Sequence, residues 1–505
     1  MAASTSMKAA NSARARMGGL LLCLAVALNA NAAKPANAVL HGEIGGRDHQ
    51  TYRQVPFEVP AGTTRITVEF EYSGRERKTT VDLGLLGPDG FYGRDGFRGW
   101  SGGNKRRFTV STTDATPSYL PGTIAPGRWA LLLGFPNVRE SSSDTFTARI
   151  WFDVPEDQPL RATPGWYRGD LHMHDAHSDG SCTSQGGQRV PCPLFVTAQQ
   201  AAAHGLDFIA VTDHNTVSQA SDLREMQPYF DQMLLMPGRE ITTFTGHGNL
   251  IGPVAPVDFR VGSTDVPDWN HLLQSIEPLG GIFSINHPIR PSGEACMGCG
   301  WAPVPPVDYA RVQAIEVVNG GDADTSYSGI PFWEKLLDEG HRITAIGGSD
   351  NHDPALTGAT PGGARIGLPT TVVKADALSQ PAILAGLRSG QVFIDVQGSR
   401  NRMLEFSARS RQQSVAMGGL LTVAKGRDIQ FEATMSNVGG GRLEVIEDGV
   451  LIQTTALAST QDQQVVRFSR RDDGRRHWTR VNVRGQDGRL WLVGNPIYRA
   501  PKTDP

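Results

Sequence analysis

Histidine and carboxylate residues recur near the ends of predicted strands in the middle of this chain, and this pattern limits the fold more than any other feature. Ten of the thirteen histidines lie between residues 172 and 352. The densest stretch, residues 170–180, has the sequence DLHMHDAHSDG. Histidines at positions i and i+2 of a strand point to one face, and two adjacent imidazoles commonly begin a transition-metal site. We therefore expect distant strand ends to meet in one pocket.

Predicted strands and helices alternate between residues 165 and 395. The expected strands are 168–174, 208–212, 234–240, 281–286, 314–318, 343–347 and 370–373. The expected helices are 194–204, 219–232, 269–278, 331–339 and 378–389. Repeated strand–helix units indicate an α/β fold with a parallel sheet or a barrel. Barrels of this kind build their active sites at the carboxyl ends of the strands, which is where the histidines and carboxylates fall.

Two regions rich in short strands flank this α/β region, since 505 residues are too many for one ordinary domain. Residues 39–155 predict a β-sandwich resembling a jelly roll, either a structural module or a carbohydrate-binding one with Phe91, Tyr92, Phe97 and Trp100. Residues 396–505 predict a small C-terminal β domain. A polar, proline-rich linker at 155–164 precedes the α/β region, which we place at 165–395.

The first 32 residues are typical of a signal peptide. Lys8, Arg14 and Arg16 precede a short apolar run at 20–28, and Ala30-Asn31-Ala32 is a cleavage motif, with Ala36-Asn37-Ala38 a second candidate. The apolar run is about half the length that spans a bilayer. We therefore expect a soluble periplasmic or secreted protein with no membrane anchor.

The charge and the cysteine content limit which classes of partner the protein can bind and indicate the compartment in which it resides. The net charge is −3 and the sequence contains no polybasic tract, so a nucleic-acid partner is disfavoured. Four cysteines remain after signal cleavage: Cys182, Cys192, Cys296 and Cys299. Export favours disulfides over a four-thiolate zinc site, although four cysteines allow three pairings. We expect disulfides that brace loops near the histidines, with the pairing left open.

Nine residues form the candidate metal-binding set. They are His172, His174, Asp179, His214, Glu240, His247, His287, Asp350 and His352. Burying six imidazoles and three carboxylates without metal would be costly, and nine ligands are too many for one transition metal. We therefore expect a multinuclear centre.

At this point the chain resembles a known family. The motifs that carry the resemblance are Asp-Leu-His-x-His with Ser-Asp-Gly, residues 205–215 (GLDFIAVTDHN), Gly-x-Glu at 238–240, Asn-His-Pro at 286–288 and Gly-Ser-Asp-Asn-His at 348–352. They are similar to the successive motifs of the PHP (polymerase and histidinol phosphatase) superfamily. The export signal, the flanking β regions, Asn249, and Gly-Asn-Pro-Ile-Tyr at 494–498 resemble its CehA/McbA-type metallohydrolase branch. The resemblance implies a distorted (β/α)7 barrel.

The resemblance also implies three metal positions. His172 and His174 would bind one ion with Glu240 and Asp350. Glu240 would bridge to a second ion held by His247 and His287. The third set would be Asp179, His214 and His352, which has no bridging carboxylate identified from the sequence and should be the most labile. The cofactors implied are two or three divalent ions, for which carboxylate and imidazole ligands favour zinc, manganese or iron.

Other residues near these motifs are candidates for catalysis and substrate binding. We expect Glu240 and Asp350, with Asp213 beside His214, to be the carboxylates that serve catalysis. Asp213 would orient a ligand or water, or alternatively cap a strand end. Arg239, Arg290 and Arg365 lie beside or between the motifs and could hold a phosphate or carboxylate.

These features together predict an exported metal-dependent hydrolase of a small ester or phosphoester. Phosphoester hydrolysis by a metal-activated hydroxide is favoured, since relatives in the superfamily are often phosphoesterases. One alternative is a carbamate or carboxylic-ester hydrolase, and another is a metal-containing binding module without catalysis. The sequence contains no serine-nucleophile motif and no phosphate-cradling glycine loop, and it leaves the oligomeric state open.

Overall fold

The structure is a computed structural model that describes residues 35–154, 159–294, 296–360, 363–411 and 413–502. The chain divides into two compact units, residues 1–36 and 37–505, and every element below belongs to the second. The expected signal peptide at residues 1–32 lies outside the described residues. Among the described helices, none is both long enough and apolar enough to cross a membrane.

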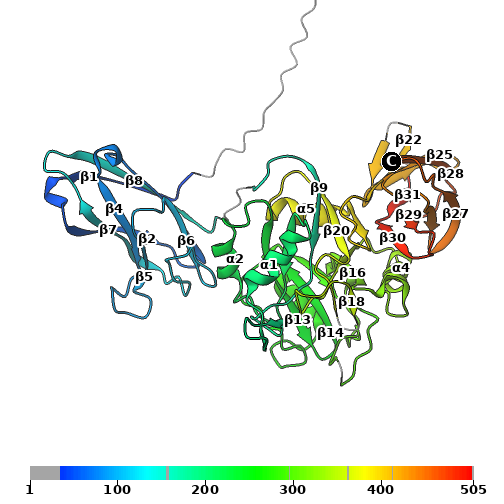
Figure 1. Cartoon of the computed structure of the whole chain (residues 1–505), viewed down its shortest axis with the longest axis horizontal. Coiled ribbons are helices and arrows are strands. Elements are labelled where there is room, and N and C mark those ends of the chain that lie inside the picture. The colour runs from blue at the N-terminus through cyan, green and yellow to red at the C-terminus, as the bar shows by residue number, and fades with distance from the viewer. Residues whose placement is uncertain (1–34, 155–158, 295, 361–362, 412, 503–505) are drawn as a thin grey trace, which may run out of the picture. The chain divides into compact units, whose positions relative to one another are not determined.

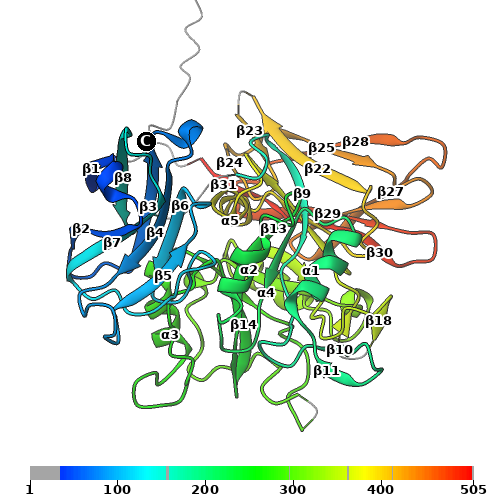
Figure 2. The same ribbon diagram turned by 60° about the vertical axis from the view of Figure 1, so that its left-hand side comes forward.

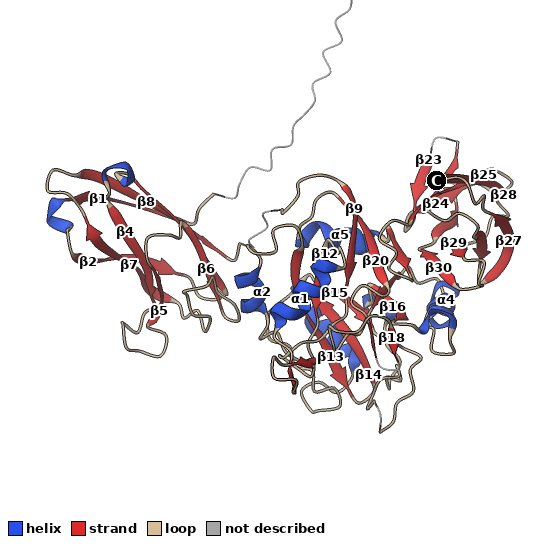
Figure 3. Cartoon of the chain, viewed as in Figure 1, coloured by secondary structure: helices blue, strands red, loops and turns tan. Residues whose placement is uncertain are grey.

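Strands outnumber helices throughout the chain (Figure 3). The first eight strands form two four-stranded antiparallel sheets, shown in blue and cyan in Figure 1. One sheet has the order β1 (Ala38–Gly45), β8 (Ser143–Phe152), β3 (Arg65–Tyr72), β6 (Arg107–Ser111). The other has the order β2 (Thr51–Val59), β7 (Gly127–Asn137), β4 (Thr80–Leu86), β5 (Phe97–Ser101). Alternating apolar residues from both sheets, among them Phe70, Phe108 and Trp129, enclose one core.

A long mixed sheet forms the centre of the chain and carries most of the candidate ligands. Its strands here are β9 (Gly165–Asp170), β12 (Phe208–Val211), β13 (Leu234–Thr243), β14 (Gly246–Ile251), β15 (Ile282–Ile285), β16 (Ala314–Asn319), β17 (Thr344–Gly348), β20 (Thr370–Ala375) and β21 (Val392–Asp395). The helices are α1 (Leu194–Ala203), α2 (Ala220–Met226), α3 (Trp269–Ile276), α4 (Ile330–Asp338) and α5 (Gln380–Ser389). Two short hairpins lie outside this sheet: β10 (Ser181–Thr183) with β11 (Arg189–Pro191), and β18 (Ala359–Thr360) with β19 (Gly363–Ala364).

Among the described residues a (β/α)7 barrel is not evident, which corrects the architecture implied by the resemblance. The sheet is mixed because β13, β14 and β15 form consecutive antiparallel pairs, and β20 is antiparallel to β9. A tight hairpin between β13 and β14 leaves no room for a helix there. The segment after β17, at one end of the sheet, still approaches the segment after the interior strand β9. Asp350 donates its backbone N–H to the His172 carbonyl, and His174 donates its backbone N–H to the Asn351 carbonyl, both at 2.9 Å.

The C-terminal strands continue the central sheet. β21 pairs with β30 (Leu490–Gly494), and the order then runs through β29 (His477–Arg484), β26 (Arg442–Glu447) and β27 (Val450–Ala456), with β31 (Ile497–Pro501) and β24 (Leu420–Val423) alongside. A second sheet has the order β23 (Gln413–Ala416), β22 (Met403–Ser410), β25 (Asp428–Ser436), β28 (Gln463–Arg471). These strands are orange and red in Figure 2, and a core that includes Phe406 and Phe431 lies between them.

Short 3₁₀ turns and two disulfides complete the described structure. The turns are η1 (Gly46–Asp48), η2 (Arg75–Arg77), η3 (Glu277–Leu279), η4 (Tyr309–Arg311) and η5 (Asp322–Asp324). Cys182 pairs with Cys192 across the β10–β11 hairpin. Cys296 pairs with Cys299 in the loop after β15. The structure thus gives the pairing that the sequence left open.

Candidate metal centre

The nine candidate ligands come together at one edge of the central sheet. Parallel pairing of β12 with β9 and β13, and of β16 with β15 and β17, brings the carboxyl ends of these strands to the same edge. His172 and His174 follow β9, Asp179 lies in the turn before β10, His214 follows β12, Glu240 lies in β13, His247 lies in β14, His287 follows β15, and Asp350 and His352 follow β17. Every member has another member within 3.6 Å.

The spacing of His172 and His174 places both rings on the same side of the chain after β9. Their ring centroids are 5.2 Å apart and both side chains are fully buried. Between them, Met173 points the other way, into the core beneath α1, and makes a parallel bridge with Asn351. An alternating segment therefore buries one apolar residue and presents two imidazoles to the centre.

Glu240 lies at the middle of the cluster, and its two oxygens face different groups. Oε1 is 3.3 Å from Nδ1 of His247 and 3.3 Å from Nε2 of His287. Oε2 faces three further ring nitrogens at 2.9–3.5 Å, those of His214, His172 and His174. A carboxylate with different nitrogen ligands on each oxygen has the arrangement of a bridge between two metal ions.

Asp350 completes a second group with the two histidines after β9. Its Oδ1 lies 3.3 Å from Nε2 of both His172 and His174, and these three residues can offer ligand atoms that all lie within 4.8 Å of one another. Asp350 and His287 both have positive φ angles, 53° and 28°. Such backbone costs on the order of 1–3 kcal/mol for a residue other than glycine, and it concentrates at functional sites.

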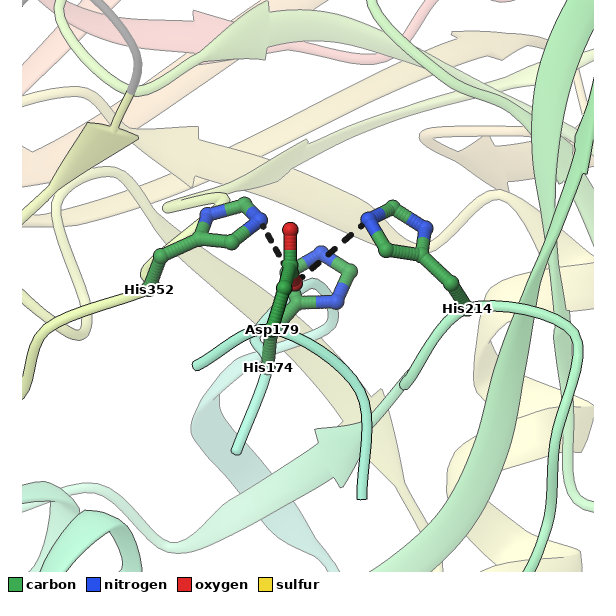
Figure 4. Close-up of side chains that lie close together, drawn as sticks. All are labelled: His174, Asp179, His214 and His352. Carbon is green, nitrogen blue, oxygen red and sulfur yellow. Dashed lines mark ion pairs between the residues drawn. The ribbon is translucent and has the colours of Figure 1, made fainter. Parts of the chain in front are cut away.

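A third group is more open to solvent. Asp179 lies between His214 and His352 (Figure 4), with Oδ1 3.6 and 3.3 Å from their Nε2 atoms. His174 is the fourth member, so this ring belongs to two groups. The side chains of Asp179, His214 and His352 are 58%, 27% and 29% exposed, whereas that of Glu240 is 1% exposed. This group is therefore the part of the cluster that is most open to solvent.

The buried titratable groups of the cluster strongly shift one another's pKa values. Burial opposes ionisation of Glu240, yet His172 and His214 hold the pKa of its carboxyl well below the usual range. Burial lowers the pKa of His172, but the carboxylates of Glu316, Asp350 and Glu240 outweigh it and raise this pKa well above normal. At His174 burial prevails and lowers the pKa to about 4. Ionised carboxylates that depend on neighbouring cations are suited to holding metal ions.

The orientation of the imidazoles also fits a metal. The Nε2 atoms of His172 and His174 are buried, and within the described residues neither has a hydrogen-bond partner. Buried polar atoms normally have partners, and these two point toward Glu240 and Asp350. A divalent cation between these nitrogens and carboxylates would satisfy them, and the donor set suits zinc, manganese or iron.

Glu316, which the sequence prediction missed, positions this site. Its Oε1 is 3.0 Å from His172 Nδ1, and its Oε2 accepts the backbone N–H of His287 at 3.0 Å and a side-chain N–H of Asn319 at 3.1 Å. A carboxylate on the far nitrogen of a ligand histidine fixes its tautomer and ring orientation. A glutamate within the otherwise apolar and fully buried start of β16, Ala314–Val318, was the available signal.

Asp213 lies behind the third group. Its Oδ1 accepts the hydroxyl of Ser178 at 2.6 Å and the backbone N–H of Asp175 at 3.0 Å. These bonds hold the turn that carries Asp179. Burial, with the nearby carboxylate of Asp213, raises the pKa of Asp175 to about 7. The side chain of Asp213 thus contacts this turn, while its backbone carbonyl accepts the N–H of Glu240 at 3.2 Å.

The three candidate arginines lie in different surroundings. Arg239 is buried and donates to two backbone carbonyls within residues 253–255. Arg365 donates to the carbonyl of the next residue. Arg290 pairs with Asp322 at 2.9–3.0 Å in the loop after β16. Among the described contacts, none joins these guanidinium groups to the nine candidate ligands.

No protein-family model matches the sequence, and neither does any curated protein. Among solved structures, the chain is similar to a two-domain protein from Bacteroides vulgatus ATCC 8482 that contains a predicted PHP-like metal-dependent phosphoesterase. The TM-score is 0.36 with 19% sequence identity, and the match covers 68% of this chain and 98% of the other. The function proposed below rests on the side chains of this chain.

Proposed function

We propose that this chain is a metal-dependent hydrolase of the PHP superfamily, of the CehA/McbA type, and that phosphoesters are its favoured substrates. The observation that carries the proposal is Glu240. Its two oxygens face two different sets of imidazoles inside a cluster of nine candidate ligands. When bound there, two or three divalent ions would lower the pKa of a water, polarise the substrate and offset negative charge in the transition state.

The residues around the cluster would prepare it for this chemistry. Glu316 orients His172, and Asp213 holds the turn of Asp179. The buried side of the cluster excludes water, while the group of Asp179, His214 and His352 admits the substrate. Adjacent positively charged positions favour a tetrahedral anion over a neutral carbonyl, which is why a phosphoester is preferred. Arg290 is the candidate for a further anion contact, after release from Asp322.

The assay that tests this function compares four substrate classes. The mature chain is reconstituted with Zn²⁺ or Mn²⁺ and given an aryl phosphate, a phosphodiester, a carboxylic ester and a carbamate. We expect phosphoester turnover that Glu240→Ala abolishes. Turnover of only the ester or carbamate would retain a hydrolase and change the substrate class. Full metal content with no turnover on any substrate would favour a binding module.

We also propose that the chain is exported after cleavage near Ala33 or Val39. The support is the charged segment, the short apolar run and the Ala-x-Ala motifs of residues 1–38. Amino-terminal sequencing of the protein recovered from outside the cytoplasm tests this. An intact segment 1–30 on the exported protein would refute it.

A further inference from the structure

The loop closed by Cys296 and Cys299 contacts both imidazoles that face Glu240 Oε1. Nε2 of His247 lies 3.2 Å from the carbonyl oxygen of Met297, and Nδ1 of His287 lies 3.2 Å from that of Cys299. A carbonyl only accepts, so each of these nitrogens must carry the proton. In a neutral ring the other nitrogen is then unprotonated and can bind a metal ion, and these are the atoms that lie 3.3 Å from Glu240.

The Cys296–Cys299 disulfide cross-links this loop. Met297 is 62% exposed, whereas Cys299 is 3% exposed. Gly298 has φ +76°, and a Cβ there would lie 2.0 Å from the Thr243 carbonyl, so the loop sits tightly against the β13–β14 hairpin. Four residues joined at both ends by a disulfide have few alternative conformations. Closure of the ring therefore restricts the positions that both carbonyls can take.

From these contacts we propose that the Cys296–Cys299 disulfide is a redox-dependent positioning device for the metal position at His247 and His287. The inference rests on the proposed metal binding. Reduction by a dithiol donor breaks the S–S bond, adds two electrons and two protons to form two thiols, and leaves the donor as a disulfide. The opened loop releases the carbonyls of Met297 and Cys299. His247 and His287 then lose their fixed tautomers, and this position loses affinity for its ion.

The experiment measures metal retention in the full mature chain. Zn²⁺-loaded protein is titrated with a chelator, and the zinc that remains is counted by mass spectrometry. The oxidised chain is compared with Cys296→Ser/Cys299→Ser. Because altering a group that orients a metal ligand typically weakens affinity roughly 10- to 100-fold, we expect one ion to be released at a chelator concentration lower by that factor. Met297→Ala keeps the disulfide and the carbonyl, and should match the wild type.

Two further variants connect the effect to the imidazoles. Gly298→Ala leaves both cysteines in place but forces the loop away from Thr243, and should weaken the same ion. In a His247→Ala background, the double serine change should add nothing, because the position is already lost. Circular dichroism and thermal unfolding establish that each variant is folded. The Cys182→Ser/Cys192→Ser pair should keep the ion at His247 and His287.

Several outcomes would overturn the inference. Equal zinc retention by the oxidised chain and the folded double serine variant would remove the role of the disulfide while leaving the proposed function intact. Failure of the oxidised wild type to bind Zn²⁺, Mn²⁺ or Fe²⁺ would instead defeat the proposed function. The Sγ of Cys299 can lie within 4.8 Å of ligand atoms of His247 and His287. Sulfur-to-cobalt charge transfer in Co²⁺-loaded Cys296→Ser would therefore make Cys299 a ligand and overturn the positioning role.

Discussion

At the scale of single residues, Glu240 connects the groups of the cluster, because five imidazoles lie within 3.5 Å of its two oxygens. We predict that Glu240→Ala loses at least one metal ion and lowers turnover by orders of magnitude, since a shared ligand supports two positions at once. Metal analysis and steady-state kinetics check this. Glu58→Ala, on an exposed strand position, serves as the control. Normal metal content and turnover in Glu240→Ala would remove its bridging role.

Glu316 allows a test of whether a residue outside the nine candidate ligands supports metal binding. We predict that Glu316→Gln, which keeps size and removes charge, weakens metal binding by roughly 10- to 100-fold, because His172 loses the partner that fixes its ring. Chelator competition measures the affinity, and thermal unfolding tests whether the fold survives. An affinity within twofold of wild type would show that Asp350 and Glu240 alone orient His172.

Most of the candidate ligands could be expected from the sequence to meet, because they lie at or shortly after predicted strand ends, where parallel pairing brings them together. Asp179 and His247 lie further from a predicted strand end. Supporting contacts were not. Glu316 is distant from every histidine motif in sequence, and the carbonyls of Met297 and Cys299 come from backbone that has no side-chain signature. The failure of Arg239 and Arg365 to contact the cluster has a similar cause. Closeness in sequence does not specify side-chain direction: Arg239 precedes Glu240 on a strand, so it points to the opposite face.

At the scale of elements, the strong apolar runs were predicted well. Helix α5 and strands β12 and β16 lie within two residues of their expected ends. Strand β14 was not predicted from the sequence, because Gly246-His-Gly-Asn at its start has a low propensity for strand. This segment forms a strand through its pairing with β13 and β15. That antiparallel hairpin, inserted before α3 (Trp269–Ile276), is a local reason why the expected (β/α)7 architecture is not evident in the described residues.

Asn495 joins elements that are distant in sequence. Its amide donates to the carbonyls of Ala345 in β17 and Val392 in β21, both at 2.9 Å, and accepts from the Ala345 N–H at 2.8 Å. We predict that Asn495→Ala costs about 2–4 kcal/mol of unfolding free energy, because buried backbone groups lose their partners. Urea denaturation measures this. The exposed Asn401→Ala should change stability by less than about 0.5 kcal/mol, and a similarly small loss at Asn495 would contradict the prediction.

We expect the stability of the contacts between β26 and its neighbours to depend on pH through Glu447. Burial raises the pKa of Glu447, but hydrogen bonding and charge from Arg470 and Arg499 outweigh it and lower this pKa. A carboxyl whose pKa is lower in the folded than in the unfolded protein stabilises the fold at pH values above its unfolded pKa. That stabilisation is lost as the pH falls through the pKa of the folded state. We predict that Glu447→Gln costs about 2 kcal/mol near pH 7 and progressively less in acid. Thermal unfolding across pH checks this, and a difference that grows in acid would be contrary to it.

At the scale of the whole molecule, the candidate centre and the C-terminal strands share one sheet, which continues from β21 into β30. Metal bound at the centre should therefore stabilise the fold well beyond its ligands. Each ion at about 100 times its dissociation constant would add roughly 2.7 kcal/mol. We predict that chelation lowers the unfolding midpoint and that re-added Zn²⁺ or Mn²⁺ restores it. An unchanged midpoint, with metal removal verified, would show that the cluster folds equally well without ions.

The exposure of the cluster falls from Asp179 at the surface to Glu240 at the base. Loaded as proposed, such a centre would not exchange its ions all at once. The outermost ion would equilibrate with the surroundings within the lifetime of the protein, while those around Glu240 would remain as a long-lived reserve. When metal is scarce, the protein would then first lose activity reversibly with its outermost ion, well before the ions around Glu240 are lost.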